Sequence, residues 1–185
     1  MKEIKPYTLA VFSENTVGIL NLISIVYTRR SINVESISAS TTVVPGITKT
    51  TVLSYSDRET MEKVIAQIEK AIYVVKAYLY TDDEIVHQEV ALYKVPTVKL
   101  MDEPELEHII RKHNARILEI THDYTVLEKT GHTDETEALF QELKQYDIRQ
   151  FVRSGRVCVT KDPVEHVSVY LAQRDKLAAE LKNQK

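Results

Sequence analysis

The sequence indicates the same order of elements twice (strand, helix, strand, strand, helix, strand), and this repeat restricts the fold more than any other feature. Alternating apolar residues mark the strands, and apolar residues three and four positions apart mark the helices. The first copy is predicted from strands at 7–12, 34–42, 48–55 and 74–80, with helices at 18–30 and from Ser56 onward. The second is predicted from strands at 89–95, 116–121, 124–129, 148–152 and 156–160, with helices beginning near Asp102 and Asp134. Two such copies predict two tandem ferredoxin-like βαββαβ domains of the α/β (α+β sandwich) class, each an antiparallel sheet with two helices on one face.

The helices of the first copy carry clear local signals. Ser56 and Glu59 have the spacing of a capping box. The helix that follows is predicted to have an apolar face made by Met61, Val64, Ile65, Ile68 and Ile72. The earlier helix is predicted to end at Arg29 and Arg30, because two cations suit the negative end of a helix dipole.

A charged segment at 81–88, T-D-D-E-I-V-H-Q, interrupts the apolar pattern and predicts the boundary between the copies. We expect a first domain over 1–82, a second over 83–162 and a C-terminal helical extension over 163–185. The extension has a modest apolar stripe at Leu171, Leu177, Ala178 and Leu181. Whether it docks on the protein or frays stays open.

Charge and composition restrict the partners. A net charge of −3 gives no excess of basic residues, which disfavours nucleic acid and anionic membranes as partners. No apolar stretch reaches the about 18 residues that span a bilayer, and the first residues lack the pattern of a secretory signal, so we expect a cytoplasmic protein. The single cysteine, Cys158, alternates in R-V-C-V-T as a small buried strand residue rather than a reactive thiol.

The sequence has no pattern of catalytic or metal-binding residues. Its four glycines are too scattered for a phosphate-binding loop or a dinucleotide fingerprint. Its six histidines have no H-E-x-x-H spacing and no cysteine beside them, so we interpret them as surface side chains. An RNA-recognition domain has the same order of elements, but it needs stacking aromatic residues on its central strands, and these are too few here. We therefore expect no catalytic residue and no metal site.

The segment S-E-N-T-V-G-I-L-N at 13–21 raises the question of why a helix begins at Gly18. Glycine weakens a helix by roughly 0.5–1 kcal/mol relative to alanine, so either the turn needs an unusual backbone angle or something approaches the backbone closely. This segment, a helix ending R-R and the following I-N-V-E-S-I-S resemble the first domain of acetolactate synthase small subunits, whose pattern is E-N-x-x-G-x-L, a helix and N-I-E-S-L. The resemblance is consistent in topology to about Thr160.

The resemblance implies a non-catalytic regulatory subunit whose first domain is an ACT domain. Such a subunit binds the thiamine-diphosphate-dependent catalytic (large) subunit, raises its activity and makes it sensitive to feedback by a branched-chain amino acid, most often valine. No cofactor is then expected in this chain, whereas thiamine diphosphate, magnesium and FAD are expected on the catalytic partner. ACT domains of this family pair side by side, so a homodimer is expected.

The resemblance also implies where the effector binds, between two paired ACT domains. Asn15, Gly18 and Ile19 of one chain and Asn33 and Val34 of the other are the implied contacts. A helix N-terminus presents unpaired N–H groups and a partial positive charge, and the missing Cβ at Gly18 lets a carboxylate reach them. Simpler interpretations stay open, with Asn15 as an N-cap, Gly18 as a close packing point and Asn33 as a turn residue.

The sequence departs from the family pattern at Ile19, where alanine is common, and at Asn21, where serine is common, so the identity of the effector stays open. A free-standing amino-acid sensor that controls another protein or a promoter is the alternative function. A hydrolase of the acylphosphatase kind would need a catalytic arginine in an anion-binding loop, whereas S-E-N-T-V-G has an acid there.

Overall fold

The computed structural model describes the backbone of residues 3–183 and the side chains of residues 3–176. By their contacts, the residues up to Val86 and those from Cys158 onward form one unit, and His87–Val157 form a second. The chain therefore leaves the first unit after Val86 and returns to it at Cys158. Whether the predicted segments 1–82, 83–162 and 163–185 fold as separate domains stays a prediction.

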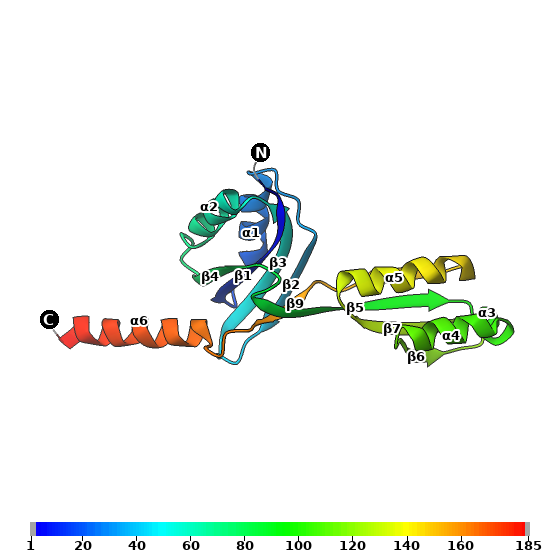
Figure 1. Ribbon diagram of the computed structural model, residues 1–185. Helices are drawn as coiled ribbons and strands as arrows, with labels where there is room; N and C mark the ends of the chain where they lie inside the picture. The colour runs from blue at the N-terminus through cyan, green and yellow to red at the C-terminus, as the bar shows by residue number, and fades with distance from the viewer. Residues whose placement is uncertain (1–2, 184–185) are drawn as a thin grey trace. The chain divides into compact units, whose positions relative to one another are not determined.

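The first unit has the predicted order of elements. They are β1 (Lys5–Glu14), α1 (Ile19–Thr28), β2 (Ser36–Thr41), β3 (Ile47–Ser56), α2 (Arg58–Ile68) and β4 (Val74–Tyr80). The strands pair antiparallel in the order β2-β3-β1-β4, and α1 and α2 lie on one face of this sheet (Figure 1). The ferredoxin-like fold predicted for the first copy is confirmed.

Alternation along β1 builds the core between the sheet and the two helices. Tyr7, Leu9 and Val11 are buried on the helix-facing side. The residues that pack against them from the helices are Ile23, Val26 and Tyr27 of α1 and Met61, Val64 and Ile68 of α2. The spacing of these helical residues puts them on one face of each helix, which is why the predicted pattern marks the core.

Two local predictions for α2 are wrong. The N-cap is Asp57 rather than Ser56, and its carboxylate accepts hydrogen bonds from both the backbone N–H and the hydroxyl of Thr60. Aspartate is as good a cap as serine, so the cap could lie at either of the two neighbouring positions. Ile72 is 86% exposed, because the helix ends at Ile68 and leaves this residue outside the apolar face.

Part of the other face of the first sheet contacts the chain's own C-terminal segment. The helix α6 (His166–Asn183) places Val167 and Leu171 against Ala10, Phe12 and Ile47. The extension therefore begins as a docked helix. The side chains of Leu177, Ala178 and Leu181, which were predicted to continue its stripe, lie outside the described residues.

The second unit repeats the order with three additions, which are two short helices and a last strand. Its elements are β5 (Ile85–Val95), α3 (Thr97–Asp102), α4 (Pro104–Lys112), β6 (Arg116–Ile120), β7 (Thr125–Gly131), α5 (Thr133–Leu143), the 3-10 helix η1 (Lys144–Tyr146), β8 (Gln150–Arg153) and β9 (Val157–Thr160), of which β5 begins and β9 ends in the first unit. The sheet order is β6-β7-β5-β8, and β9 also pairs with β5. Strand β5 begins inside the segment predicted as a boundary, and the short helix α3 was not predicted.

The core of the second unit lies between β5, β7 and the helices α4 and α5. Its members are Ala91, Tyr93, Val95, Leu106, Ile109, Ile110, Leu127, Leu139, Leu143 and Tyr146. Phe151 stacks on Tyr93 and on Phe140, with ring centroids 5.1 and 4.2 Å apart. Cys158 is buried on β9, which confirms its prediction as a small strand residue.

Candidate functional site

The turn between β1 and α1 ends at Gly18, which is the N-cap of α1. Gly18 has φ 96° and ψ −5°, a left-handed conformation that glycine adopts without a steric penalty. No side chain caps this helix, and the first intrahelical bond runs from the N–H of Leu22 to the carbonyl of Gly18 over 2.9 Å. A Cβ built at Gly18 would meet no heavy atom within 4 Å. The start of α1 is thus an open helix N-terminus, and glycine is there for its backbone angle and not for close packing.

Asn15 does not cap α1, so the interpretation of this residue as the N-cap is wrong. Its side chain is exposed, and its backbone N–H donates to the carbonyl of Gly46, in the turn between β2 and β3, over 3.1 Å. Gly46 is also left-handed, with φ 78°. The backbone of Asn15 is therefore used in joining two turns, while its amide group faces outward.

Asn33 lies in the connection between α1 and β2. Its side-chain N–H donates to the carboxylate of Glu35 over 3.1 Å, and both residues are exposed. The left-handed residue of this connection is Ser31, with φ 53°, so the interpretation of Asn33 as the left-handed turn residue is wrong. The amide of Asn33 keeps its oxygen available as an acceptor.

The two apolar residues of the predicted site share one environment. Ile19 and Val34 are half-buried, and both pack against the core under α1 and α2. Within the described residues no hydrogen bond joins Asn15 or Gly18 to Asn33. No hydrogen bond within one chain therefore holds the Asn15–Gly18–Ile19 part of the predicted site against the Asn33–Val34 part.

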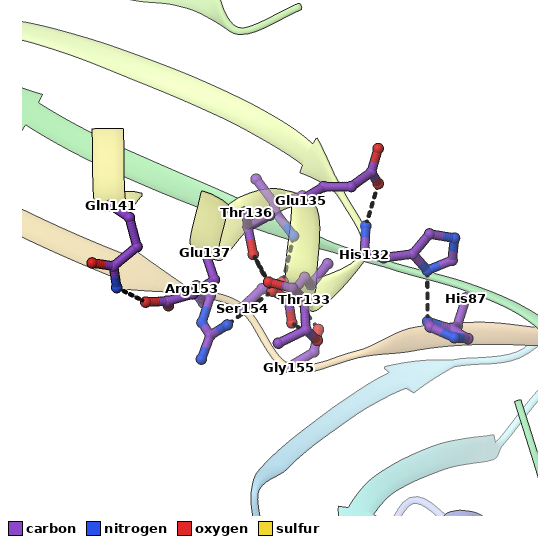
Figure 2. Close-up of polar contacts among 12 residues, drawn as sticks. His87, His132, Thr133, Glu135, Thr136, Glu137, Gln141, Arg153, Ser154 and Gly155 are labelled. Atoms are coloured by element: carbon purple, nitrogen blue, oxygen red, sulfur yellow. Dashed lines mark hydrogen bonds and ion pairs between the residues drawn. The ribbon is translucent and has the colours of Figure 1, made fainter. Parts of the chain in front are cut away.

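The second unit contains a buried polar cluster that sequence reasoning missed. Glu89 of β5 is 7% exposed, and it accepts hydrogen bonds from the hydroxyls of Thr136 (2.6 Å) and Thr133 (3.2 Å) and pairs with Arg153 at 3.4 Å. The two threonines lie in the first turn of α5, where a carboxylate suits the helix dipole (Figure 2). The alternation of Glu89 with Ala91 and Tyr93 was the signal that this acid points inward.

Two histidines meet beside this cluster. The Nδ1 atoms of His87 and His132 are 3.4 Å apart, and the rings are edge to face (Figure 2). His132 is the N-cap of α5, and its backbone N–H donates to the carboxylate of Glu135 over 2.8 Å in a capping box. His87 is buried, so the interpretation of all histidines as surface residues is wrong for this one. The contact between the two histidines therefore lies at the N-cap of α5.

Two findings bear on other classes of function. Within the described residues, no three His, Cys, Asp or Glu side chains gather into a group that could hold a metal ion. Over the same part of the chain, no helix is both long and apolar enough to cross a bilayer.

Known proteins resemble this chain in fold, and family models match both of its halves. The family model for the ACT domain of acetohydroxyacid synthase (AHAS) small subunits matches residues 9–76, and the model described as the small subunit of acetolactate synthase matches residues 88–162. A Bacillus subtilis protein named acetolactate synthase small subunit is 30% identical over 155 residues, which is 83% of this chain and 90% of that protein. The chain belongs to the acetolactate synthase small-subunit family.

One further relative agrees with this assignment, and one solved structure shares the fold. An Archaeoglobus fulgidus protein named "Probable acetolactate synthase small subunit" is 31% identical over 84% of this chain and 96% of its own length. The crystal structure of the acetolactate synthase small subunit from Thermotoga maritima has the same fold, with a TM-score of 0.77 and 23% identity over 86% of this chain and 99% of that chain. As a member of this family, the chain is a regulatory, non-catalytic subunit, and its first unit is an ACT domain.

Proposed function

We propose that this chain binds the thiamine-diphosphate-dependent catalytic subunit of acetolactate synthase, raises its activity and makes it sensitive to a branched-chain amino acid, with valine as the expected effector. This would be a feedback step in valine, leucine and isoleucine biosynthesis. The observation that carries the proposal is the open, uncapped start of α1 at Gly18, in the ACT domain of a chain of this family. Thiamine diphosphate, magnesium and FAD would be bound by the catalytic subunit.

The start of α1 suits the carboxylate of an amino acid. The first N–H groups of a helix have no partner within the helix, and they carry the positive end of its dipole. No side chain competes for them here, and no acidic residue lies in the first turn. Ile19 provides an apolar surface beside them. We propose that Asn15, Gly18 and Ile19 form one half of the effector site.

Two features support a dimer that would bring Asn33 and Val34 of a second copy to this half-site. Strand β2 is an edge of the first sheet, and its sequence S-I-S-A-S-T lacks the charges and prolines that protect exposed edges. Helix α1 also has an apolar outer side, because Leu20 is 48% exposed and Ile25 is 40% exposed. A helix that is apolar on both sides is typically covered, and a second copy of this chain would cover it.

Titration of valine into the purified chain, followed by calorimetry, tests the effector site. Saturable binding of about one ligand per chain supports the proposal, and leucine and isoleucine titrated in the same way rank the effectors. Addition of the chain to the catalytic subunit tests activation, with activity measured in the presence and absence of valine. Binding of valine without any binding to the catalytic subunit would favour a free-standing sensor instead.

Mixed dimers test whether two chains build each site. If each site uses Gly18 of one chain and Asn33 of the other, a Gly18→Asp chain paired with an Asn33→Ala chain has one site with both defects and one site with neither. If the effector site lies between chains, both pure variants lose valine binding and the mixed dimer binds at half the wild-type stoichiometry. If each chain holds a complete site, the mixed dimer stays as defective as its two parents.

A further inference from the structure

Several buried hydroxyl groups around α1 have no hydrogen-bond partner. Over the described residues, the buried side-chain oxygens without a partner are those of Ser13, Thr16, Tyr27 and Thr50. Tyr27 belongs to α1, and Thr16 lies in the turn that leads into it. Ser13 and Thr50 belong to β1 and β3, and both residues are fully buried. All four groups thus lie in α1, in the turn before it or in the sheet beneath the helices.

The register of the sheet places two of these hydroxyls close together. Ser13 lies opposite Thr48, and Val11 lies opposite Thr50, so Ser13 and Thr50 are diagonal neighbours on one face. This is the face that packs against the helices, because Val11 and Leu9 belong to the core there. A hydroxyl buried without a partner has lost its hydrogen bonds to water and gained none. The present packing of α1 over this face therefore carries an unrecovered cost.

Helix α1 also lacks the stabilisation that its neighbour α2 has. α1 has no side-chain cap and no acidic residue in its first turn. α2 is capped by Asp57, has Glu59 in its first turn and carries the ion pairs Arg58–Glu62 and Lys63–Glu59. Contacts of these kinds decide how firmly the ends of a helix are held.

The sequence of α1, I-L-N-L-I-S-I-V-Y-T, also indicates a helix with a low intrinsic preference for the helical state. β-Branched and aromatic residues lose side-chain freedom in a helix, and asparagine and serine compete for its backbone hydrogen bonds. Only the two leucines are strong helix formers. Packing, rather than intrinsic preference, therefore holds α1 in place, and that packing includes the unpartnered hydroxyls.

We infer that α1 is metastable in the ligand-free chain and that it is the element whose position the effector changes. The second part rests on the proposed function. A carboxylate at the first turn supplies the N-terminal stabilisation that α1 lacks, and a shift of α1 lets Ser13 and Thr50 reach partners. Effector binding and the position of α1 are then linked, so a change that favours the ligand-free position weakens binding.

Hydrogen exchange on the whole chain tests the first part. If α1 is metastable, its amides have protection factors at least about tenfold lower than those of α2, because local opening costs less free energy there. Equal protection in the two helices would overturn the inference.

Two near-isosteric substitutions test the role of the hydroxyls. Ser13→Ala and Thr50→Val each remove an unpartnered group, so each should raise the thermal unfolding midpoint, by about 2–8 °C. Ser54→Ala is the matched control, because Ser54 is equally buried but donates to the sulfur of Met61 over 3.8 Å. Its midpoint should fall or stay the same. Midpoints that fail to rise for both Ser13→Ala and Thr50→Val would mean that these hydroxyls are satisfied, which would overturn the inference.

Valine binding to the double variant tests the link to the effector. We expect the double variant to bind valine with a Kd at least about threefold weaker than that of the unaltered chain. Valine should also change the hydrogen-exchange protection of α1 less in the variant than in the unaltered chain. An unchanged Kd, with no effect of valine on α1 in either protein, would overturn the second part. A wild-type chain that binds no valine would reject the proposed function, while exchange and melting would still decide whether α1 is metastable.

Discussion

The backbone N–H of Asn15 donates a hydrogen bond to the carbonyl oxygen of Gly46 over 3.1 Å, and this bond joins the β1–α1 turn to the β2–β3 turn. Gly46 and Gly18 are both left-handed, a conformation that residues with a Cβ rarely adopt. The base of the β1–α1 turn is thus held by backbone contacts while the helix end that follows is uncapped. A ligand bound at the start of α1 would act on the less constrained end.

Replacing Gly18 by aspartate should abolish the response to valine and leave the chain folded. A Cβ added at Gly18 meets no heavy atom within 4 Å, and aspartate tolerates the left-handed conformation at a cost of about 1–2 kcal/mol. Its carboxylate would repel the carboxylate of the effector. Gly18→Asn has the same shape without the charge and should lose less affinity. Inhibition of reconstituted acetolactate synthase is the measurement, and full inhibition of the aspartate variant would rule out this site.

Replacing Val167 by alanine should destabilise the first unit by about 1.5–2.5 kcal/mol, because two buried methyl groups are lost. Val167 is 1% exposed and packs on the sheet, whereas Val169 on the same helix is 43% exposed. Val169→Ala should change the free energy of unfolding by less than about 0.5 kcal/mol. Urea unfolding compares the two variants. An effect of Val167→Ala as small as that of Val169→Ala would show that docking of α6 adds no stability.

Glu128 should make the second unit sensitive to acid. Hydrogen bonds from the hydroxyl of Thr130 and the guanidinium of Arg116 lower the pKa of this carboxyl group. A pKa that is lower in the folded state stabilises the fold above the unfolded-state pKa, and this contribution is lost as the pH falls through the folded-state pKa. Between about pH 5 and 3, the unfolding midpoint should fall more steeply for the wild type than for Glu128→Gln. Parallel pH profiles would contradict this assignment.

Replacing Thr136 by valine should cost about 1–3 kcal/mol, since the buried carboxylate of Glu89 loses its shortest hydrogen bond. Thr133→Val should cost less, because the Thr133 hydroxyl lies farther from Glu89, at 3.2 Å. In a Glu89→Gln background the effect of Thr136→Val should shrink, because an uncharged side chain needs the donor less. Chemical unfolding of the wild type, Thr136→Val, Glu89→Gln and the double variant gives the coupling energy, and a value near zero would show that this bond is weak.

Much of the fold could be predicted from local patterns, and the start of β5 shows where such patterns fail. Leu9 and Val11 alternate with residues on the other face and mark β1 directly. In β5 the inward positions before Ala91 are Ile85, His87 and Glu89, of which two are polar. A rule that finds strands by inward apolar residues passes over such a segment, and the buried histidine and glutamate were missed for the same reason.

The candidate site could be predicted in part. The start of a helix at Gly18 follows from local sequence, and of the two explanations left open for this glycine the structure shows the unusual backbone angle. The bond from Asn15 to Gly46 depends on two turns that are distant in the sequence, so no local pattern contains it. Ser13 and Thr50 have the sequence pattern of ordinary strand residues. Only the packed structure shows that their hydroxyls lack partners. The assignment of the five residues to an effector stays a prediction.

The order in which the chain visits its two units makes His87–Val157 an inserted module. Cutting the gene after residue 82 would therefore not isolate an intact ACT unit, since the cut would also discard Val167 and Leu171, which pack against its sheet. Excising the module instead would require Val86 to be joined to Cys158. The segments on either side of this junction are already held together, because the backbone N–H of Lys161 donates to the carbonyl of Glu84 over 2.9 Å. A short turn would close that gap, so the module is expected to be exchangeable, as a surface loop is.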